Sequence, residues 1–333
     1  MHAYRVVRGE GPQSLHLVDL PGPTMGEKQV LLAVKAASLN YRDLLVARGL
    51  MGEGDYRIPL SDAVGQVIAI GPAVTDFVVG DAAIPIFFPQ WSEGYPSEDA
   101  LALSLGGNVE GVLATHVVVD ERALVRAPRT LSWEQASTIA CAGVTAWNAL
   151  FELEPMPPHA RVLIQGTGGV STWAVQLAVA AGLQVTHVSG RQESTERMMA
   201  LGVQAAINYS SESNWDERVM AMTGGVDRVL DIGGAGTIAR SLRSLRPGGQ
   251  VVTIGGVAGG FGLNIDPFAL IGGRSLTGVV VGSRAMTQSL VKFIDENALV
   301  PVIDSVFSFD QAANAYQRME HGRPIGKVVI AID

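Results

Sequence analysis

Apolar residues follow two different periods along this chain, and the change of period divides it. Over residues 1 to about 130, short runs rich in β-branched residues are separated by Gly and Pro, which is typical of brief strands joined by turns. The clearest of these runs are QVLLAVKAASL, AVGQVIAIG, GDAAIPIF and ATHVVVD. This part of the chain is therefore predicted to be a compact β-rich domain.

Helical spacing begins at Ser132, in SWEQASTIACAGVTAWNALFELE, where the serine is a typical N-cap. Beyond it strands and helices alternate, and strands such as RVLIQ and QVTHVS are almost entirely apolar. Such strands are expected when helices cover both faces of a parallel sheet, so the second part is predicted to be a doubly wound α/β domain. We expect a β-rich domain over 1–130, the doubly wound domain over 131–272, and a return segment over 273–333. That segment would complete the sheet edge and the first domain.

A glycine-rich loop lies between a predicted strand and a predicted helix in RVLIQ-GTGGVS-TWAVQ. Glycine lets the backbone turn sharply and approach a pyrophosphate, and the helix N-terminus attracts the phosphates. Ser171 stands at the third glycine position of the common fingerprint, where a small residue suffices for packing. The predicted cofactor contacts in this loop are Gly166, Thr167, Gly168, Gly169 and Val170.

The end of the next predicted strand indicates the type of cofactor. NAD-preferring sites usually place an acidic residue there, about 20 residues beyond the loop, to bind the ribose hydroxyls. Here the sequence reads Ser189, Gly190 and Arg191, and no acid occurs before Glu193. A hydroxyl and a guanidinium can bind a 2′-phosphate, so these residues predict NADP(H). The alternative is that Arg191 is a solvated loop charge.

Composition and charge narrow the class of protein. The 333 residues carry 24 Lys and Arg against 32 Asp and Glu, a net charge of −8, with no basic block of the kind that binds nucleic acid. A single Cys excludes a disulfide framework and a thiolate-rich zinc site. The apolar runs are shorter than the roughly 20 residues of a membrane span, and the N-terminus does not read as a signal peptide. We therefore expect a soluble, cytoplasmic protein that binds neither nucleic acid nor membrane.

Several stretches in order along the chain resemble one known family. They include SLNYRDLLVARG, CAGVTAW, the GTGGVS loop, LRPGGQVVTIGG and VVVGSR. Together they resemble the medium-chain dehydrogenase/reductase superfamily, in its zinc-free, quinone oxidoreductase-like branch. The resemblance implies an α/β protein with a GroES-like β-rich catalytic domain and a Rossmann domain, a cleft between them, and a homodimer formed through the Rossmann sheet edge.

The resemblance also implies further cofactor contacts. Thr145 would lie near the nicotinamide, and Tyr209 near the 2′-phosphate, although Tyr209 also fits a surface tyrosine at a strand end. The predicted lining of the nicotinamide is Gly255, Gly256, Val280, Val281 and Gly282. Core packing is the alternative for Val280. Lys327 in GKVVI is counted with the cofactor site, and it could pair with Asp43.

Zinc-dependent relatives hold the metal with two Cys and one His, and this chain departs from that pattern. The corresponding positions are Asn40, a residue at or near Ser61, and Cys141, so only one position keeps a ligand type. One thiolate without imidazole partners cannot hold a catalytic zinc. The six His residues show no metal-binding spacing, and His187 reads as a structural histidine within a strand. We therefore expect no metal.

Without a metal, hydrogen bonds must stabilise the substrate oxygen as hydride arrives. The segment SLNYRD is the best candidate, because Asn40 can donate from its amide and Tyr41 could donate or relay a proton. A turn residue that bonds its own backbone is the alternative for Asn40. Enoyl-reductase relatives carry a proton-donating Tyr where this chain has Met51, so either Tyr56 takes that role or water or a backbone amide protonates the product. Arg42 replaces a proton-relay hydroxyl of the zinc relatives.

These observations predict a metal-free, NADPH-dependent reductase whose hydride acceptor is a quinone or an α,β-unsaturated carbonyl, the substrates that the resemblance implies. The aromatic segment FFPQWSEGY would form part of the substrate wall, or else an apolar surface loop. One alternative is a carbonyl reductase or alcohol dehydrogenase of the same fold. Another is a non-catalytic NADPH-binding protein of the crystallin-like kind. Short-chain reductases are excluded, because no Tyr-x-x-x-Lys occurs in the chain.

Overall fold

The computed structural model describes residues 1–256 and 265–333, which form two compact units. The first unit comprises residues 1–144 and 281–333, and the second comprises residues 145–280. These limits differ from the expected boundaries at 130 and 272 for local reasons. Helix α3 (Trp133–Ala136) packs on strands of the first unit, whereas strand β14 (Ser275–Gly278) belongs to the sheet of the second.

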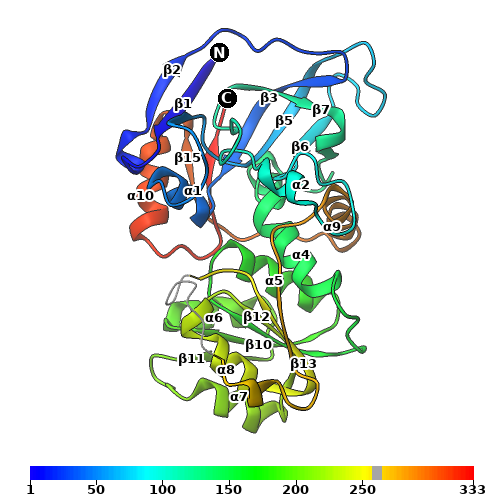
Figure 1. Ribbon diagram of the computed structural model, residues 1–333, viewed down its shortest axis with the longest axis vertical. Helices are drawn as coiled ribbons and strands as arrows, with labels where there is room; N and C mark the ends of the chain where they lie inside the picture. The colour runs from blue at the N-terminus through cyan, green and yellow to red at the C-terminus, as the bar shows by residue number, and fades with distance from the viewer. Residues whose placement is uncertain (257–264) are drawn as a thin grey trace. The chain divides into compact units, whose positions relative to one another are not determined.

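The first unit is built on two β-sheets. The larger has seven strands in the order β15-β16-β3-β5-β6-β8, with β7 paired to β3, and the smaller has the order β2-β1-β4. Strands β1, β2, β3, β5, β6, β7 and β15 are labelled in Figure 1. The strands of the larger sheet are β3 (Gln29–Ser38), β5 (Asp62–Ile70), β6 (Ala82–Pro85), β7 (His116–Asp120), β8 (Leu124–Arg126), β15 (Ile303–Ser308) and β16 (Lys327–Ala331). Those of the smaller sheet are β1 (His2–Val7), β2 (His16–Asp19) and β4 (Tyr56–Arg57).

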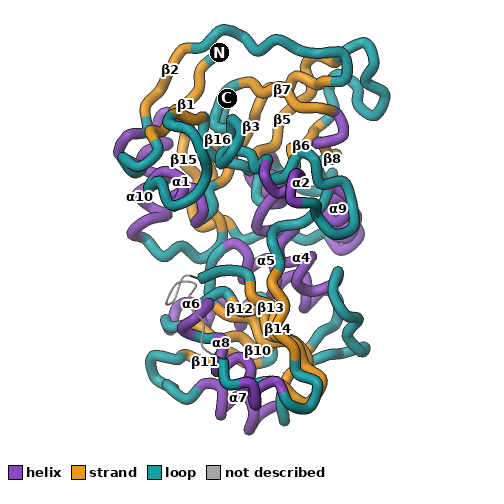
Figure 2. The backbone as a smooth tube through the Cα atoms, viewed as in Figure 1, coloured by secondary structure: helices purple, strands orange, loops and turns teal. Residues whose placement is uncertain are grey.

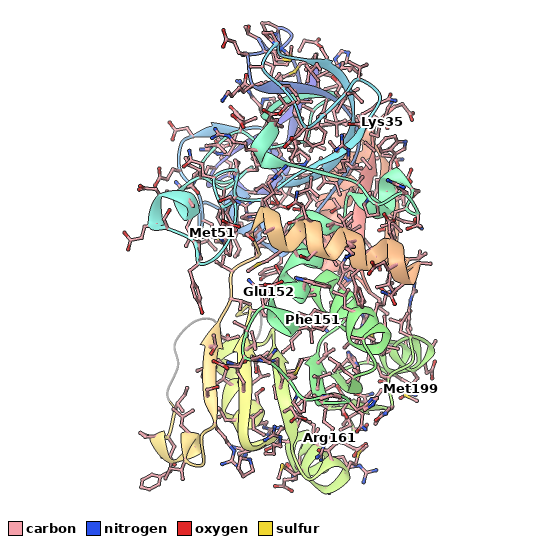
Figure 3. The ribbon with its side chains drawn as sticks, turned by 90° about the vertical axis from the view of Figure 1, so that its right-hand side faces the viewer. Lys35, Met51, Phe151, Glu152, Arg161 and Met199 are labelled. Atoms are coloured by element: carbon pink, nitrogen blue, oxygen red, sulfur yellow. The ribbon has the colours of Figure 1, made fainter. Side chains whose placement is uncertain are left out.

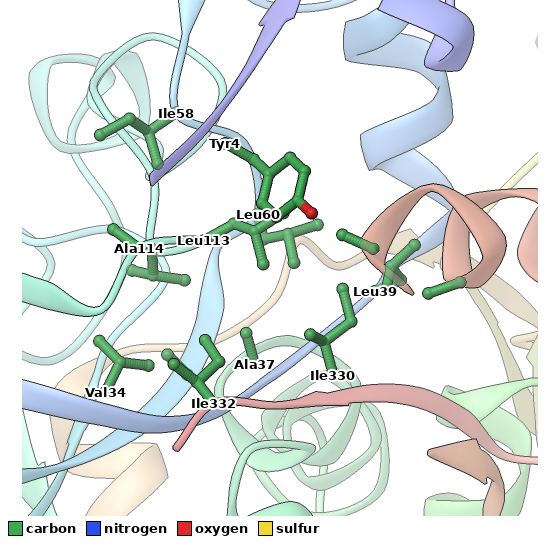
Figure 4. Close-up of a cluster of buried hydrophobic side chains, with 14 of the residues drawn as sticks. Tyr4, Val34, Ala37, Leu39, Ile58, Leu60, Leu113, Ala114, Ile330 and Ile332 are labelled. Carbon is green, nitrogen blue, oxygen red and sulfur yellow. The ribbon is translucent and has the colours of Figure 1, made fainter. Parts of the chain in front are cut away.

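Strand β3 organises the larger sheet, because it pairs with β5, β7 and β16. Its residues alternate between buried and partly buried, which is the period of two that the sequence predicts over this run. The last strand of the chain, β16, pairs antiparallel with β3 and opposes Val329 to Ser38. The C-terminal segment therefore completes the first unit. The hydrophobic core of this unit includes Tyr4, Leu60 and Ile330, the last of which belongs to β16 (Figure 4).

The helices of the first unit are short except for the last two. They are α1 (Tyr41–Ala47), α2 (Glu98–Ala102), α3, the π-turn η3 (Ile139–Gly143), α9 (Arg284–Asn297) and α10 (Ala312–His321). Single 3-10 turns lie at η1 (Pro12–Ser14), η2 (Glu121–Ala123) and η6 (Phe309–Gln311). The helix predicted from Ser132 is thus interrupted by a π-turn before α4 begins. No helix among the described residues is long and apolar enough to cross a membrane.

The second unit is a six-stranded parallel sheet with helices packed on it, which confirms the predicted doubly wound α/β fold (Figure 2). Its strands, in sheet order, are β11 (Ala205–Asn208), β10 (Gln184–Ser189), β9 (Arg161–Gln165), β12 (Val226–Asp231), β13 (Leu245–Thr253) and β14. Its helices are α4 (Val144–Phe151), α5 (Gly169–Ala180), α6 (Gln192–Ala200), α7 (Trp215–Thr223) and α8 (Ile238–Arg243), with 3-10 turns η4 (Gly234–Gly236) and η5 (Pro267–Leu270).

The order of the strands reverses beside β9. The chain runs from β9 outward to β11 and then crosses back to β12 on the other side of β9. Helices α5 and α6 pack on the β9–β11 half, whereas α7 packs against α8 on the other half. In such sheets, ligands bind beyond the carboxyl ends of the strands at the point of reversal. The glycine loop that follows β9 lies at that point.

Candidate active site

The glycine loop has the backbone geometry of a phosphate cradle. Gly166 lies in the left-handed region at φ 78°, and its N–H donates to the carbonyl of Val188 at 2.9 Å. Helix α5 begins at Gly169 with Gly168 as its N-cap, and a Cβ added at Gly168 would meet no atom within 4 Å. The first N–H groups of a helix have no partner within it. An open, glycine-lined helix start fits the pyrophosphate of a dinucleotide.

Two side chains hold the carbonyl groups of this loop. The Ser171 hydroxyl donates to the carbonyl of Gln165 at 2.7 Å, and the Nε2 atom of His187 lies 2.6 Å from the carbonyl oxygen of Gly166. Both side chains are buried. Ser171 therefore does more than fill the small position that the sequence predicts. His187, expected to be merely structural, contacts the glycine bend itself.

The predicted adenosine-end residues come together where β10 ends. The Ser189 hydroxyl is buried and has no hydrogen-bond partner among the described residues, and Arg191 is the N-cap residue of α6. A Cβ on Gly190 would stand 2.5 Å from Cζ of Tyr209, so glycine is needed for the tyrosine ring to lie there. A buried hydroxyl without a described partner, two residues before an arginine, fits a phosphate on the ribose.

Asp231 is a buried residue of this region that sequence reasoning missed. It ends β12 and accepts hydrogen bonds from the N–H of Gly234 and the hydroxyl of Thr237, both at 2.8 Å. Its second oxygen accepts from Ser241 at 2.5 Å and from the side chain of Gln165 at 3.3 Å. Asp231 thus ties the end of β12 to the residue before the glycine loop. Its position after an apolar run, in VLDIGG, was the available signal.

The predicted nicotinamide contacts fall in both units. Thr145 is buried at the start of α4, Gly255 and Gly256 follow β13, and Val280, 41% exposed, ends the second unit. Val281 and Gly282 belong to the first unit. There a Cβ on Gly282 would stand 2.5 Å from a methyl of Val144, so this glycine is needed for close packing.

A polar cluster in the first unit, buried except for the partly exposed Cys141, occupies the positions that correspond to the zinc ligands. The Lys327 ammonium donates to Oδ1 of Asn40 at 2.5 Å and lies 3.5 Å from Oδ2 of Asp62. The amide of Asn40 donates to Ser61 at 3.4 Å, and the Ser61 hydroxyl donates to Oδ1 of Asp62 at 2.7 Å. The backbone N–H of Cys141 donates to Oδ2 of Asp62 at 3.1 Å. We call these five residues the polar cluster.

The expected pairing of Lys327 with Asp43 is wrong. Asp43 instead accepts from the backbone N–H of Asn40 at 2.8 Å and lies 3.7 Å from the Arg42 guanidinium. The strand register explains the difference. Because β16 opposes Val329 to Ser38 and β5 opposes Asp62 to the same serine, Lys327 lies beside the residues that follow β3.

The lysine fixes the orientation of the Asn40 amide. An ammonium group can only donate hydrogen bonds, so the atom of Asn40 that faces it must be the oxygen. The NH₂ group of Asn40 is then directed away from Lys327, toward Ser61. Asn40 is 8% exposed and Lys327 is 2% exposed, so the contact is almost fully desolvated. The sequence predicts that Asn40 donates a hydrogen bond. In the structure, Lys327 binds the Asn40 oxygen and so directs the NH₂ group away from itself as a donor.

Burial raises the pKa of Asp43 to about 6, although Arg42 and the backbone bond from Asn40 act in the opposite direction. One oxygen of Asp43 has no hydrogen-bond partner among the described residues.

Arg42 donates to the carbonyl of Leu105 at 2.6 Å and its guanidinium carbon lies 4.7 Å from the centre of the Phe87 ring. Arg42, which the sequence could not interpret, therefore anchors this part of the first unit.

Of the two predicted tyrosine donors, Tyr41 has a described side chain. Tyr41 directly follows Asn40 as the first residue of α1, is 48% exposed, and its hydroxyl makes no hydrogen bond to the cluster among the described residues. Tyr56 begins β4 opposite Val7, and its side chain lies outside what the structure describes. Met51, at the position of the proton-donating tyrosine of enoyl-reductase relatives, is 45% exposed (Figure 3). The roles of Tyr41 and Tyr56 as proton donors stay predictions.

The aromatic segment expected at the substrate wall faces inward for the most part. Phe87, Phe88 and Trp91 are each about 5% exposed. The ring centre of Phe88 lies 4.6 Å from that of Phe87 and 6.2 Å from that of Trp91, so the three rings pack on one another. Tyr95 is 97% exposed. The segment is therefore a small core with one exposed tyrosine, rather than an apolar surface loop.

The residues of the polar cluster do not fit a zinc ion. Burial, with a smaller effect of Asp62, raises the pKa of the Cys141 thiol far above its usual value, so the thiol stays protonated. The Lys327 ammonium stands next to it in the cluster, and a cation repels a metal ion. In the part of the chain that the structure describes, no three His, Cys, Asp or Glu side chains are placed to hold a metal. Zinc needs several deprotonated donors, and the carboxylate of Asp62 is the one that this cluster offers, already paired with the lysine.

Two family models match the chain. Residues 26–129 match the alcohol dehydrogenase GroES-like domain, and residues 169–296 match the zinc-binding dehydrogenase domain. A zinc-type alcohol dehydrogenase-like protein of Schizosaccharomyces pombe is 38% identical over 321 residues, covering 92% of this chain and 91% of that protein. An acryloyl-coenzyme A reductase of Sulfurisphaera tokodaii is 26% identical over 96% of this chain and 97% of that protein.

Solved structures agree with these matches. The crystal structure of a candidate alcohol dehydrogenase from Sinorhizobium meliloti 1021 is 36% identical, has a TM-score of 0.92, and covers 99% of this chain and 98% of that chain. An NAD-dependent alcohol dehydrogenase is 30% identical with a TM-score of 0.90, over the full length of both chains. The GroES-like and Rossmann parts of the predicted fold are thereby confirmed. This chain belongs to the medium-chain dehydrogenase/reductase family of NAD(P)-dependent oxidoreductases.

Proposed function

We propose that this chain is a metal-free reductase that uses NADPH to reduce a quinone or an α,β-unsaturated carbonyl. The observation that carries the metal-free part is the polar cluster, in which a buried lysine, and not a cation-binding set of ligands, holds Asn40 and Asp62. Bound NADPH supplies a hydride to the electron-poor carbon of the acceptor. The chain's own residues bind that cofactor and stabilise the oxygen of the substrate.

We assign the stabilising hydrogen bond to the amide of Asn40. Its oxygen is taken by Lys327, and an amide NH₂ group has two hydrogens. One points toward Ser61 at 3.4 Å, which leaves the second for a substrate oxygen. A donor that is already oriented before the reaction costs no reorganisation, which is why such donors contribute about 10²- to 10³-fold to kcat.

The preference for NADPH over NADH rests on the end of β10. Ser189 has a buried hydroxyl without a partner, and Arg191 is the only charged residue of the SGR segment. A charge-assisted bond to a 2′-phosphate would use both groups. Arg191→Glu should weaken NADPH binding strongly and NADH binding little. The matched control is Arg197→Glu, an exposed position on the same helix α6. Equal affinities for NADPH in the two variants would contradict the assignment.

The substrate class is tested by following NADPH consumption with quinones, enones, aldehydes and simple ketones, each with and without a chelator. We expect turnover with quinones or enones, unchanged by the chelator, and a loss of about 10²-fold in kcat for Asn40→Ala. Asn297→Ala, at the exposed end of α9, serves as the control. Inactivation by the chelator would overturn the metal-free mechanism.

Two other outcomes of that screen favour different functions. Several relatives are described as alcohol dehydrogenases, and turnover of simple aldehydes or ketones alone would make this chain a zinc-free carbonyl reductase or alcohol dehydrogenase. NADPH binding without oxidation across the whole panel would favour a non-catalytic, crystallin-like protein.

We also propose a homodimer formed through the edge of the six-stranded sheet. Strand β14 is the last strand in the sheet order, and among the described residues it pairs with β13 on one side only. An edge strand offers unpaired N–H and C=O groups to a second copy. Light scattering at several concentrations gives the mass in solution, and a monomer at all concentrations would contradict this proposal.

A further inference from the structure

The side chain of His187 makes one hydrogen bond among the described residues, and that bond is to the glycine loop. It lies on β10, fully buried, with Nε2 2.6 Å from the carbonyl oxygen of Gly166. A carbonyl oxygen only accepts, so Nε2 carries the proton. The other ring nitrogen, Nδ1, is buried and has no partner among the described residues. Burial also lowers the pKa of His187 to about 4, so the ring is neutral at ordinary pH.

Stability alone does not account for a histidine at this position. A buried polar atom without a partner costs more than a typical hydrogen bond returns, so the ring loses at Nδ1 at least what it gains at Nε2. An apolar residue would fill the same space in the sheet without that cost. The bond to Gly166 is then the feature that distinguishes His187 from a leucine or phenylalanine.

That bond determines the direction of a peptide group in the candidate phosphate cradle. In a trans peptide, the C=O and the following N–H point in opposite directions. Because His187 holds the Gly166 carbonyl on the inner side of the loop, the N–H of Thr167 faces outward, on the ligand side. Gly166 is in the left-handed region at φ 78°, where glycine is free to rotate, so its peptide needs an external restraint.

The neighbouring groups of the loop are restrained in the same manner by other residues. The Ser171 hydroxyl holds the Gln165 carbonyl at 2.7 Å, and the Gly166 N–H is held by Val188 at 2.9 Å. The bond from His187 completes this set, because the Gly166 carbonyl has no other partner among the described residues.

We propose that His187 is a positioning residue for the cofactor, which acts by holding the Gly166–Thr167 peptide with its N–H toward the pyrophosphate. This inference rests on the proposed NADPH site. It predicts that His187 contributes to binding of the pyrophosphate and not to binding of the adenosine end, where Ser189 and Arg191 lie. A residue that only supports the fold would affect both.

The test compares two ligands on three proteins: the wild type, His187→Phe and Val185→Ala. His187→Phe keeps a ring and removes the donor. Val185→Ala removes buried volume on the same strand and, by the alternation of side chains, from the same face. Dissociation constants are measured by calorimetry for NADPH and for 2′-AMP, which has the 2′-phosphate but no pyrophosphate. Thermal unfolding of each protein reports its stability.

We expect His187→Phe to weaken NADPH binding about tenfold, which corresponds to about 1.4 kcal/mol, and to leave 2′-AMP binding unchanged. Val185→Ala should lower the melting temperature and leave both affinities unchanged. His187→Gln, which returns a side-chain N–H, should recover part of the NADPH affinity. Amide hydrogen exchange at Thr167 without ligand should accelerate in His187→Phe.

The outcomes separate the two ideas. A wild type that binds neither NADPH nor 2′-AMP contradicts the proposed function, whatever the variants do. A wild type that binds both, together with a His187→Phe variant of unchanged NADPH affinity, contradicts the role of His187. Equal weakening of both ligands in His187→Phe also contradicts it, because that pattern indicates general damage to the fold.

Discussion

The buried lysine of the polar cluster gives a quantitative prediction. In Lys327→Met, Asp62 keeps its bonds from the Ser61 hydroxyl and the Cys141 N–H but loses its counter-ion at 3.5 Å, and it is fully buried. Removing one partner of a buried ion pair costs about 3–5 kcal/mol. Because two donors remain on the carboxylate, we expect the lower end, about 3 kcal/mol. That loss is large against the 5–15 kcal/mol of a typical domain.

The double variant separates charge from orientation. Asp62→Asn alone should also cost about 3 kcal/mol, since it leaves the Lys327 ammonium buried without its carboxylate. In Lys327→Met/Asp62→Asn neither charge remains, so we expect a loss near 3 kcal/mol, half of the sum of the single changes. The activity should behave differently. Because the lysine no longer holds the Asn40 oxygen, kcat should stay low in the double variant, although this variant should be no less stable than either single variant.

Urea unfolding followed by circular dichroism gives the free energies, and NADPH consumption gives kcat. The control is Lys292→Met, since the Lys292 side chain is 76% exposed and pairs only with Glu296 at 3.8 Å. Such a surface change is expected to stay within about 0.5 kcal/mol. The reasoning is refuted by additive losses in the double variant, by a cost for Lys327→Met no greater than the control, or by full activity without the lysine.

Three further predictions concern other groups. Burial raises the pKa of Asp43 from 3.8 to about 6, so the native state binds its proton more tightly, and stability should rise as pH falls through this window. Asp43→Asn should remove about 2 kcal/mol of that change in urea unfolding between pH 7 and 4. An identical pH profile in the variant would contradict the assignment. Burial raises the pKa of the Cys141 thiol, so this thiol should react slowly with iodoacetamide at pH 8 in the native protein and at the normal rate after unfolding. Mass spectrometry measures the labelling, and fast labelling of the native protein would contradict this prediction. Gly190→Ala should weaken NADPH binding in calorimetry, because its Cβ would stand 2.5 Å from the Tyr209 ring, and adding Tyr209→Ala should relieve the clash without restoring affinity; wild-type affinity in Gly190→Ala would argue against a role for this tyrosine.

The fold was predictable because its signals are local. The glycine loop after RVLIQ, the apolar strands and the alternation along β3 each depend on neighbouring residues, and each is found where the sequence predicts it. The interruption of the helix predicted from Ser132 was not predictable in the same way. The π-turn at Ile139–Gly143 directs the N–H of Cys141 at Asp62, a residue far away in the sequence.

The polar cluster was predictable only in part, because the contacts between its residues depend on pairing between strands that are far apart in the sequence. Asn40, Ser61 and Cys141 were singled out one by one, but their partners depend on strand register. Whether Lys327 reaches Asp43 or Asn40 is decided by the pairing of β16 with β3, and a shift of one residue would turn the lysine to the other face of the sheet. Register between strands almost 300 residues apart leaves no mark on the spacing of motifs.

In each unit, one buried side chain fixes the direction of one amide. Lys327 directs the side-chain amide of Asn40 in the first unit, and His187 directs the peptide after Gly166 in the second. The depressed pKa of His187, about 4, means that the unfolded chain binds its proton more readily, so this group destabilises the protein as pH falls. Asp43 has the opposite sign over an overlapping range. The two effects oppose each other, so the stability of the whole chain could change little with pH in the acid range although each group has a steep effect. The unfolding of each unit must therefore be followed separately to observe them.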